Sequence, residues 1–202
     1  MPELKVCGMT DAAFACVAAR RGVDYLGLIF AEGSPRRVTV EQALEIAAAV
    51  SELPTVRLVG VFVSHAPSEI AAIASRVGLD VIQLHGDYGA DEVSELKTAG
   101  YEVWALGGSE ASDSADAVLL DGQIGGQRGG TGRLADWSLV TGLKRAGRRV
   151  VLAGGISAEN IAAAVATGAD VIDANSSLET APGVKSVERL DSLLSQLANL
   201  PT

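Results

Sequence analysis

Two side chains stand where short apolar runs end, and their types could carry chemistry: the thiol of Cys7 and the carboxyl group of Asp121. Lys5 lies two positions before Cys7, so strand alternation places both on one face, where a cation favours a reactive thiolate. Asp121 ends the run VLLD and precedes GQIGGQRGGTG at 122–132, whose glycines would allow a lid to close and exclude water. The plainer interpretations are a buried, unreactive cysteine and a turn aspartate.

Two glycine- or serine-containing segments follow the last two apolar runs and together predict an anion site. Gly154 and Gly155 would let a ligand approach backbone N–H groups, and Ser157 is placed to cap a helix that begins at the next residue. Asn175 and Ser176 follow the eighth apolar run and could form the start of another short helix. Each segment alone is ordinary turn chemistry, but two helix N-termini side by side bind phosphate without a cationic side chain.

Arg36 and His85 are two further polar side chains expected in loops after apolar runs. Arg36 follows Pro35, which restricts the backbone, and its planar guanidinium could bind a carboxylate at the end of the ligand away from the phosphate. A solvated surface arginine is the alternative. His85 is more typical of a structural histidine, and with His65 as the only other histidine the sequence predicts no metal site.

The elements that must position these side chains are short apolar strands alternating with alanine-rich helices, for example at 40–50, 68–77 and 158–167. Eight apolar runs without alternation favour an α/β fold, a closed (β/α)8 TIM barrel that forms one domain over residues 1–202. Residues 107–116 are few and rich in Gly, Ser and Asp, so we expect a short or irregular fifth helix. In such a barrel the loops after the strands carry the chemistry. The eight runs begin near Leu4, Tyr25, Arg57, Val81, Glu102, Ala117, Arg149 and Val171.

Composition and charge limit the partners of this chain. Acidic residues outnumber basic ones 25 to 16, and the net charge of −9 argues against nucleic acid or an anionic membrane surface as a partner. Cys7 and Cys16 occur without a CxxC or Cys/His cluster, which excludes a zinc ribbon or a disulfide scaffold. No apolar run approaches the ~18 residues of a membrane-spanning helix. We therefore expect a cytoplasmic protein with a small-molecule ligand, either a monomer or a homodimer.

Motifs from one end of the chain to the other resemble the phosphoribosylanthranilate isomerase family. The resemblance implies a (β/α)8 barrel that acts in tryptophan biosynthesis without a cofactor. The implied reaction is the Amadori rearrangement of N-(5-phosphoribosyl)anthranilate, a phosphorylated small molecule, to 1-(2-carboxyphenylamino)-1-deoxyribulose 5-phosphate. The matching motifs are KVCGMT at 5–10, SPRRV at 34–38, GVFV at 60–63, QLHG at 83–86, LLDG at 119–122, GGTG at 129–132, AGGIS at 153–157 and APGVK at 181–185.

The same resemblance implies a role for each candidate side chain. Cys7 corresponds to the general base of the family and Asp121 to its general acid. Arg36 would bind the anthranilate carboxylate, and Asp173 would lie near the sugar hydroxyls. The residues implied to bind the phosphate are Gly154, Gly155, Asn175 and Ser176.

The chain departs from the family pattern in two segments. The family commonly reads DVSSGVE where this chain has DANSSLE at 173–179, so Asn175 replaces a serine and Ser177 a glycine. We expect Ser177 to strain a position that prefers a positive φ. Arg133 follows GGTG where the family usually has Lys, which puts lid closure in question.

Acid–base chemistry at neutral pH requires both candidate groups to have shifted pKa values. Free aspartic acid has a pKa near ~3.9 and free cysteine near ~8.5, so Asp121 would be ionised and Cys7 protonated. We expect burial to raise the pKa of Asp121, and a cation or N–H groups to lower that of Cys7. The alternatives are another phosphate-binding barrel isomerase or a metal-dependent sugar-phosphate epimerase, a hydrolase that uses Cys7 and His85, and a phosphate-binding module without catalysis.

Overall fold

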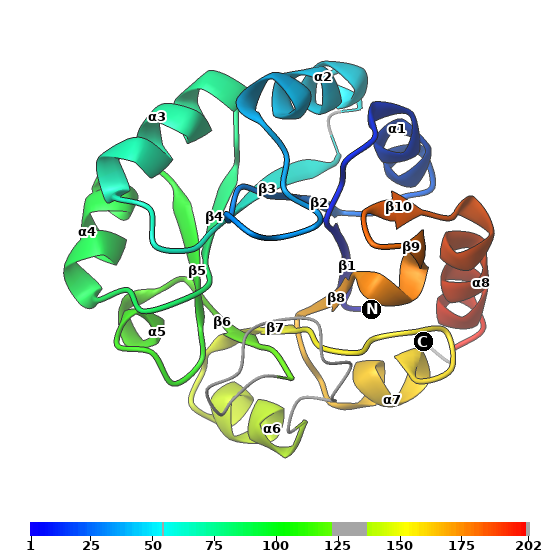
Figure 1. Cartoon of the computed structure of the whole chain (residues 1–202). Coiled ribbons are helices and arrows are strands. Elements are labelled where there is room, and N and C mark those ends of the chain that lie inside the picture. The colour runs from blue at the N-terminus through cyan, green and yellow to red at the C-terminus, as the bar shows by residue number, and fades with distance from the viewer. Residues whose placement is uncertain (54, 123–136, 201–202) are drawn as a thin grey trace.

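The structure is a computed structural model that describes residues 1–53, 55–122 and 137–200 (Figure 1). Eight parallel strands pair in chain order and form a closed barrel, because β8 also pairs with β1. The predicted barrel is confirmed; its first strand begins at Glu3, and the other seven begin at the predicted residues. The strands are β1 (Glu3–Cys7), β2 (Tyr25–Ile29), β3 (Arg57–Phe62), β4 (Val81–Leu84), β5 (Glu102–Leu106), β6 (Ala117–Leu120), β7 (Arg149–Leu152) and β8 (Val171–Ala174).

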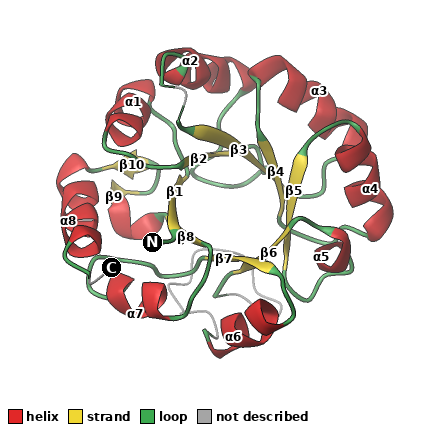
Figure 2. Ribbon diagram, turned by 180° about the vertical axis from the view of Figure 1, so that it is seen from behind, coloured by secondary structure: helices red, strands yellow, loops and turns green. Residues whose placement is uncertain are grey.

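Helices surround the barrel on the outside, as Figures 1 and 2 both show. Some of their alanines, such as Ala15, Ala43 and Ala74, are buried in the core. Local signals set several ends: Thr39 and Gln42 form a capping box at the start of α2, and Gly78 ends α3 in the left-handed conformation. The expected short fifth helix is confirmed, since α5 has four residues. The helices are α1 (Ala12–Arg20), α2 (Val40–Val50), α3 (Pro67–Val77), α4 (Ala90–Thr98), α5 (Ala111–Ser114), α6 (Ser138–Arg145), α7 (Ile161–Ala166) and α8 (Val187–Ala198).

The chain between β8 and α8 contains two elements that the repeat does not predict. A 3-10 helix, η1 (Ser176–Leu178), begins one residue after the end of β8, with Asn175 between them. An antiparallel hairpin of β9 (Glu179–Ala181) and β10 (Val184–Lys185) comes next, and it lies between β1 and α8 in both Figure 1 and Figure 2. This insertion is important for the site because it sits beside the carboxyl end of β1.

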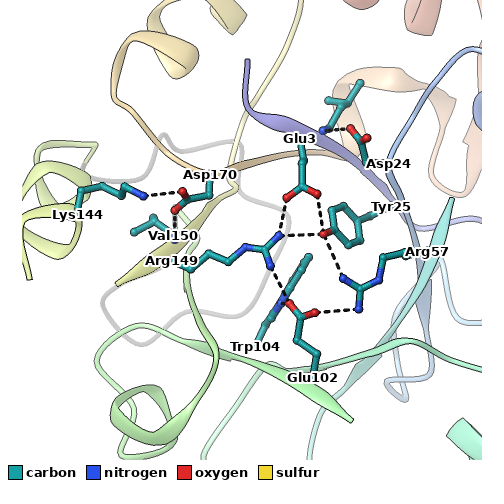
Figure 3. A network of polar contacts seen from close by, with 11 residues as sticks. Glu3, Asp24, Tyr25, Arg57, Glu102, Trp104, Lys144, Arg149, Val150 and Asp170 are labelled. Atoms are coloured by element: carbon teal, nitrogen blue, oxygen red, sulfur yellow. Dashed lines mark hydrogen bonds and ion pairs between the residues drawn. The ribbon is translucent and has the colours of Figure 1, made fainter. Parts of the chain in front are cut away.

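The amino end of the barrel is closed by a polar network made from first residues of strands (Figure 3). Arg149 binds Glu102 at 3.1 Å and Glu3 at 2.5 Å, and Arg57 binds Glu102 at 2.8 Å. The Tyr25 hydroxyl accepts a hydrogen bond from Arg149 and donates one to Glu3. Next to this layer lies an apolar cluster, with Trp104 and Tyr25 in edge-to-face contact. The amino end is therefore filled and charge-paired, which leaves the carboxyl end for ligands.

None of the described helices is both long enough and apolar enough to cross a lipid bilayer.

Candidate active site

The candidate thiol lies at the carboxyl end of β1, where Cys7 is the last residue and only 5% exposed. The thiol fits there because β2 has a glycine opposite: a Cβ on Gly27 would come within 2.6 Å of the Cys7 sulfur. Lys5 is on the same face two residues earlier and is fully buried. The sequence placed both residues correctly on one face of the strand.

Closure of the barrel pairs Lys5 with Asp173, which lie opposite each other in the β1–β8 register. The Lys5 ammonium donates to Asp173 Oδ2 at 2.6 Å, inside a buried ion pair. Asp173 Oδ1 is buried as well and has no hydrogen-bond partner among the described residues. An unpaired carboxylate oxygen at this end of the barrel is suited to accept a hydrogen bond from a ligand hydroxyl.

The pKa of the Cys7 thiol is raised, contrary to the expectation from sequence. Burial is the largest influence; the Lys5 ammonium opposes it, whereas Asp173 adds to the rise. The expectation was wrong because the Lys5 charge is already paired with Asp173 and offsets only part of the lost hydration. Burial also raises the pKa of Asp173, and the negative charge of Asp121 contributes to that rise.

Asp121 follows β6 and lies at the same end of the barrel as Cys7 and Asp173. Its Oδ2 is 3.9 Å from His85 Nε2, which follows β4. Gly154 packs against it: a Cβ there would come within 2.4 Å of the Gly122 nitrogen and 3.0 Å of Asp121 Oδ1. The glycine-rich segment after Gly122 and the departure at Arg133 fall in 123–136, outside the described residues, so the lid remains a prediction.

The loops after β7 and β8 lie side by side, as the predicted anion site requires. The Ser177 hydroxyl donates to the carbonyl of Ile156, which joins the two loops. Gly154 and Gly155 have positive φ values of 86° and 68°, a conformation that favours glycine. Asn175 precedes η1, whose first residue is Ser176. The four predicted phosphate-binding residues are therefore close in space.

Two local expectations in these loops were wrong. Ser177 does not have a positive φ, because it is the middle residue of η1, and the only non-glycine residue with a positive φ in the described ranges is Ser64. Ser157 is not the N-cap of a helix at 158: residues 158–160 form a turn, and α7 begins at Ile161 after Asn160. The Asn160 side chain accepts from the Ser157 N–H and donates to the Gly155 carbonyl, which holds the turn instead.

Arg36 is part of a buried charge cluster rather than a solvated surface residue. Its Nε and Nη2 atoms donate to the two carboxylate oxygens of Glu179 at 2.8 Å each. Glu179 also accepts from the Lys185 ammonium at 2.9 Å, and that ammonium donates to Asn175 Oδ1 at 2.8 Å. Sequence reasoning missed Glu179 and Lys185, although Lys185 ends the motif APGVK that carried part of the resemblance.

Burial would raise the pKa of Glu179, but hydrogen bonds from Arg36 and Lys185 keep it below its usual value. The carboxylate therefore stays ionised at neutral pH. The described ranges, this site included, contain no group of three His, Cys, Asp or Glu side chains that could hold a metal ion. The polar side chains described at this site are thus a thiol, carboxylates, ammonium groups, one guanidinium, the His85 imidazole and the Asn175 amide.

A closed eight-stranded barrel with these groups at the carboxyl ends of its strands defines an enzyme of the (β/α)8-barrel class. Residues 4–196 match the family model of N-(5'-phosphoribosyl)anthranilate (PRA) isomerase. A curated relative, N-(5'-phosphoribosyl)anthranilate isomerase of Rubrobacter xylanophilus, is 44% identical over 93% of this chain and 95% of the relative. The chain belongs to the PRA isomerase family and is an isomerase of tryptophan biosynthesis.

Solved structures of the family share the fold over the whole chain. Phosphoribosyl anthranilate isomerase from Thermus thermophilus superposes with a TM-score of 0.87 at 35% identity, covering 98% of this chain and 100% of that one. A second PRA isomerase, solved in complex with reduced 1-(o-carboxyphenylamino)-1-deoxyribulose 5-phosphate, has a TM-score of 0.83 at 27% identity. The match covers 99% of this chain and all of that protein, which binds a phosphorylated analogue.

Proposed function

We propose that this chain converts N-(5-phosphoribosyl)anthranilate to 1-(2-carboxyphenylamino)-1-deoxyribulose 5-phosphate, with Cys7 as general base and Asp121 as general acid. The observation that supports these roles is their placement: both lie at the carboxyl end of the barrel, and Asp173 links them electrostatically, because its charge raises the pKa of Cys7 while the charge of Asp121 raises that of Asp173. The strands that carry them, β1 and β6, belong to different parts of the closed ring. A substrate bound between them would be approached by an acid and a base.

The first step is opening of the furanose ring. The reactive form carries the proton on Asp121 and leaves Cys7 as the thiolate. Asp121 donates this proton to the ring oxygen as the bond from that oxygen to C1 breaks, and the nitrogen lone pair forms the C1=N bond of a protonated Schiff base. In the second step the Cys7 thiolate takes the proton from C2, and that electron pair forms an enolamine. Tautomerisation of the enolamine, with a proton added at C1 and the proton of the C2 hydroxyl released as the C2=O bond forms, gives the ketone. Atoms balance because substrate and product are isomers.

The neighbours of Cys7 supply the charge that the base needs. Because burial raises the thiol pKa, the thiolate is the minor form before substrate binds, and the ammonium groups of Lys5 and Lys185 stabilise it. Both lysines are buried, so water screens their effect on the thiolate only weakly. The thiolate form of Cys7 can therefore accept a proton, although the thiol is the major form before substrate binds.

The remaining roles place the two ends of the substrate. Arg36 binds the anthranilate carboxylate, and the unpaired Oδ1 of Asp173 accepts from a sugar hydroxyl. The phosphate lies at the joined loops after β7 and β8, where glycines with positive φ leave no side chain between a ligand and the backbone N–H groups. The residues assigned to the phosphate are Gly154, Gly155, Asn175 and Ser176.

Turnover by single-site variants tests the acid and the base. Cys7→Ala and Asp121→Asn are each expected to reduce kcat by ~10²-fold or more, the usual effect of losing a general acid or base. The assay follows loss of substrate fluorescence, with substrate formed from anthranilate and ribose 5-phosphate. Cys16→Ala and Asp91→Asn are the matched controls and should keep normal turnover. Near-normal kcat in either active-site variant would remove that assignment.

We further propose that residues 1–202 form one cytoplasmic domain that is a monomer or a homodimer. One barrel includes β1 and β8, so the ends of the chain depend on each other for closure. A single unfolding transition by calorimetry, and a mass from light scattering equal to one or two chains, are the expected results.

A further inference from the structure

The cluster of Arg36, Glu179, Lys185 and Asn175 includes two charged residues, Glu179 and Lys185, to which the proposed reaction assigns no contact with the substrate. Arg36 is 15% exposed and is the most accessible of the three charged members, because the Glu179 and Lys185 side chains are 4% and 2% exposed. Buried charges destabilise a fold unless they are paired, so an extra cation beside an existing ion pair calls for a reason.

The contact between Arg36 and Glu179 holds one edge of the guanidinium. Nε and Nη2 donate side-on to both carboxylate oxygens, an arrangement that defines the plane and the direction of the group. Among the residues that the structure describes, Nη1 has no hydrogen bond or ion pair. The end-on edge, formed by Nη1 and the second N–H of Nη2, is therefore available for another carboxylate.

The arginine stem crosses the end of β1 next to the catalytic thiol. A Cβ on Gly8 would come within 2.9 Å of Arg36 Cδ and within 2.9 Å of Asn175 Oδ1, so Arg36 and Asn175 pass close to one another over Gly8. The guanidinium and the Cys7 thiol are near enough to interact electrostatically. The end-on edge of the Arg36 guanidinium therefore lies at the same site as the Cys7 thiol.

The net charge of the cluster gives a reason for the presence of Lys185. The Lys185 nitrogen has three acceptors, namely the Asn175 carbonyl at 3.0 Å, Asn175 Oδ1 at 2.8 Å and Glu179 Oε1 at 2.9 Å. Three acceptors match the three N–H groups of an ammonium, whereas a neutral amine has two. Arg36 and Glu179 alone would be neutral as a pair. With Lys185 the cluster keeps one positive charge, which complements a carboxylate.

The hairpin brings both residues to this position. Glu179 and Lys185 are opposite one another in the β9–β10 register, at the base of the hairpin. At its turn, the Gly183 carbonyl accepts from Thr10 Oγ1 at 2.6 Å, and a Cβ on Gly183 would meet the Pro35 carbonyl at 3.1 Å. The hairpin is thus fastened to the segments that follow β1 and β2, including the loop that carries Arg36.

We propose that Glu179 is a positioning residue that aims Arg36 at the substrate carboxylate, and that Lys185 supplies the excess charge that makes the site selective for an N-aryl ribosylamine bearing that carboxylate. This inference rests on the proposed function. It predicts a substrate preference that the hairpin controls, although neither residue touches the reacting atoms.

The experiment compares two substrates: the N-glycoside of ribose 5-phosphate with anthranilate, and the N-glycoside with aniline, which lacks the carboxylate. Glu179→Gln removes the charge and one of the two acceptors from Arg36. It should lower kcat/KM for the anthranilate compound about 10- to 100-fold, mainly through KM, because the aimed contact is a charge-assisted pair. Turnover of the aniline compound should change less than about threefold, because this compound has no carboxylate for Arg36 to bind. A small change that is equal for both substrates would not reflect that contact. Glu95→Gln, an exposed glutamate on α4, is the matched control.

Further variants separate positioning from folding. Glu179→Asp keeps the charge but withdraws it by one methylene, so it should give an intermediate loss for anthranilate only. Lys185→Met removes one charge that stabilises the Cys7 thiolate, so it should slow both substrates, and it should lower the preference for the carboxylate in addition by removing the excess charge. In an Arg36→Met background, Glu179→Gln should cause no further loss of preference. Melting temperatures identify any variant that is unfolded, and Glu179→Asp then carries the test.

Two results would overturn the inference: equal losses on both substrates in Glu179→Gln and Glu179→Asp, or an additional loss in the Arg36→Met background. If the unaltered protein turns over neither substrate, the proposed function fails instead, and this outcome is distinct from a loss of selectivity.

Discussion

Replacement of Lys5 by methionine is the most informative single perturbation of this barrel, because it removes one partner of a buried ion pair next to the Cys7 thiol, the proposed general base. Lys5 is fully buried and its ammonium lies 2.6 Å from Asp173 Oδ2. Methionine is similar in length and fills the space, so the main consequence is an unpaired carboxylate whose Oδ1 already has no partner among the described residues. Breaking a buried pair in this way costs about 3–5 kcal/mol of unfolding free energy.

The expected loss depends on pH in a direction that follows from linkage. Asp173 already has a raised pKa in the folded protein, and removal of Lys5 raises it further, because the lysine is the main influence that lowers it. A carboxyl group with a raised folded pKa stabilises the fold at low pH, and this contribution is lost as pH rises through that pKa. Lys5→Met should therefore be destabilised less at pH 5 than at pH 8, by up to about 1.4 kcal/mol per pH unit.

Urea unfolding at several pH values measures this loss, and the reactivity of Cys7 provides a second readout. The pKa of the thiol should rise further without the Lys5 ammonium, so alkylation in a Cys16→Ala background should require a higher pH. In the double variant Lys5→Met/Asp173→Leu, most of the stability should return, because an apolar pair can replace a buried ion pair. A loss below about 1 kcal/mol at pH 8, the value typical of exposed pairs, would refute the buried ion pair.

Two further predictions concern the opposite ends of the barrel. Arg149→Met removes the partner of Glu3 and Glu102 at the amino end of the barrel. It should lower the unfolding free energy by about 1–2 kcal/mol, a value reduced because the ion pairs are partly exposed, and leave kcat at 25 °C unchanged. A change in kcat would show that the two ends of the barrel are coupled. Gly154→Ala should reduce kcat/KM by about tenfold or more, because a methyl group there collides with Gly122 beside Asp121, the proposed general acid. Gly168→Ala is its control: φ is also positive, +82°, but the space is open, so it should lose about 1 kcal/mol of stability and no activity. Equal activity losses in the two glycine variants would contradict the steric explanation.

Local sequence predicted most of the architecture because strand and helix periodicity are properties of neighbouring residues. Seven of eight strands begin at the predicted residue, and the short fifth helix follows from the composition of 107–116. Cys7 and Lys5 share a face by alternation alone. Inference from neighbouring residues failed where the same turn sequence is compatible with more than one backbone conformation. Ser157 and Ser177 could not be placed correctly, since a competing side chain, Asn160, and a 3-10 helix set those backbones.

By itself, the sequence determined the repeat of eight strands, the placement of the candidate acid and base at strand ends, and membership of an isomerase family. Only the tertiary structure decided which charges meet. Lys5 and Asp173 are 168 residues apart, and Arg36 and Glu179 are 143 apart, so neither pair leaves a local signal. Barrel closure and the β9–β10 hairpin bring them together and bury them. The thiol pKa rises for the same reason, because the cost of lost hydration depends on the whole enclosure around Cys7.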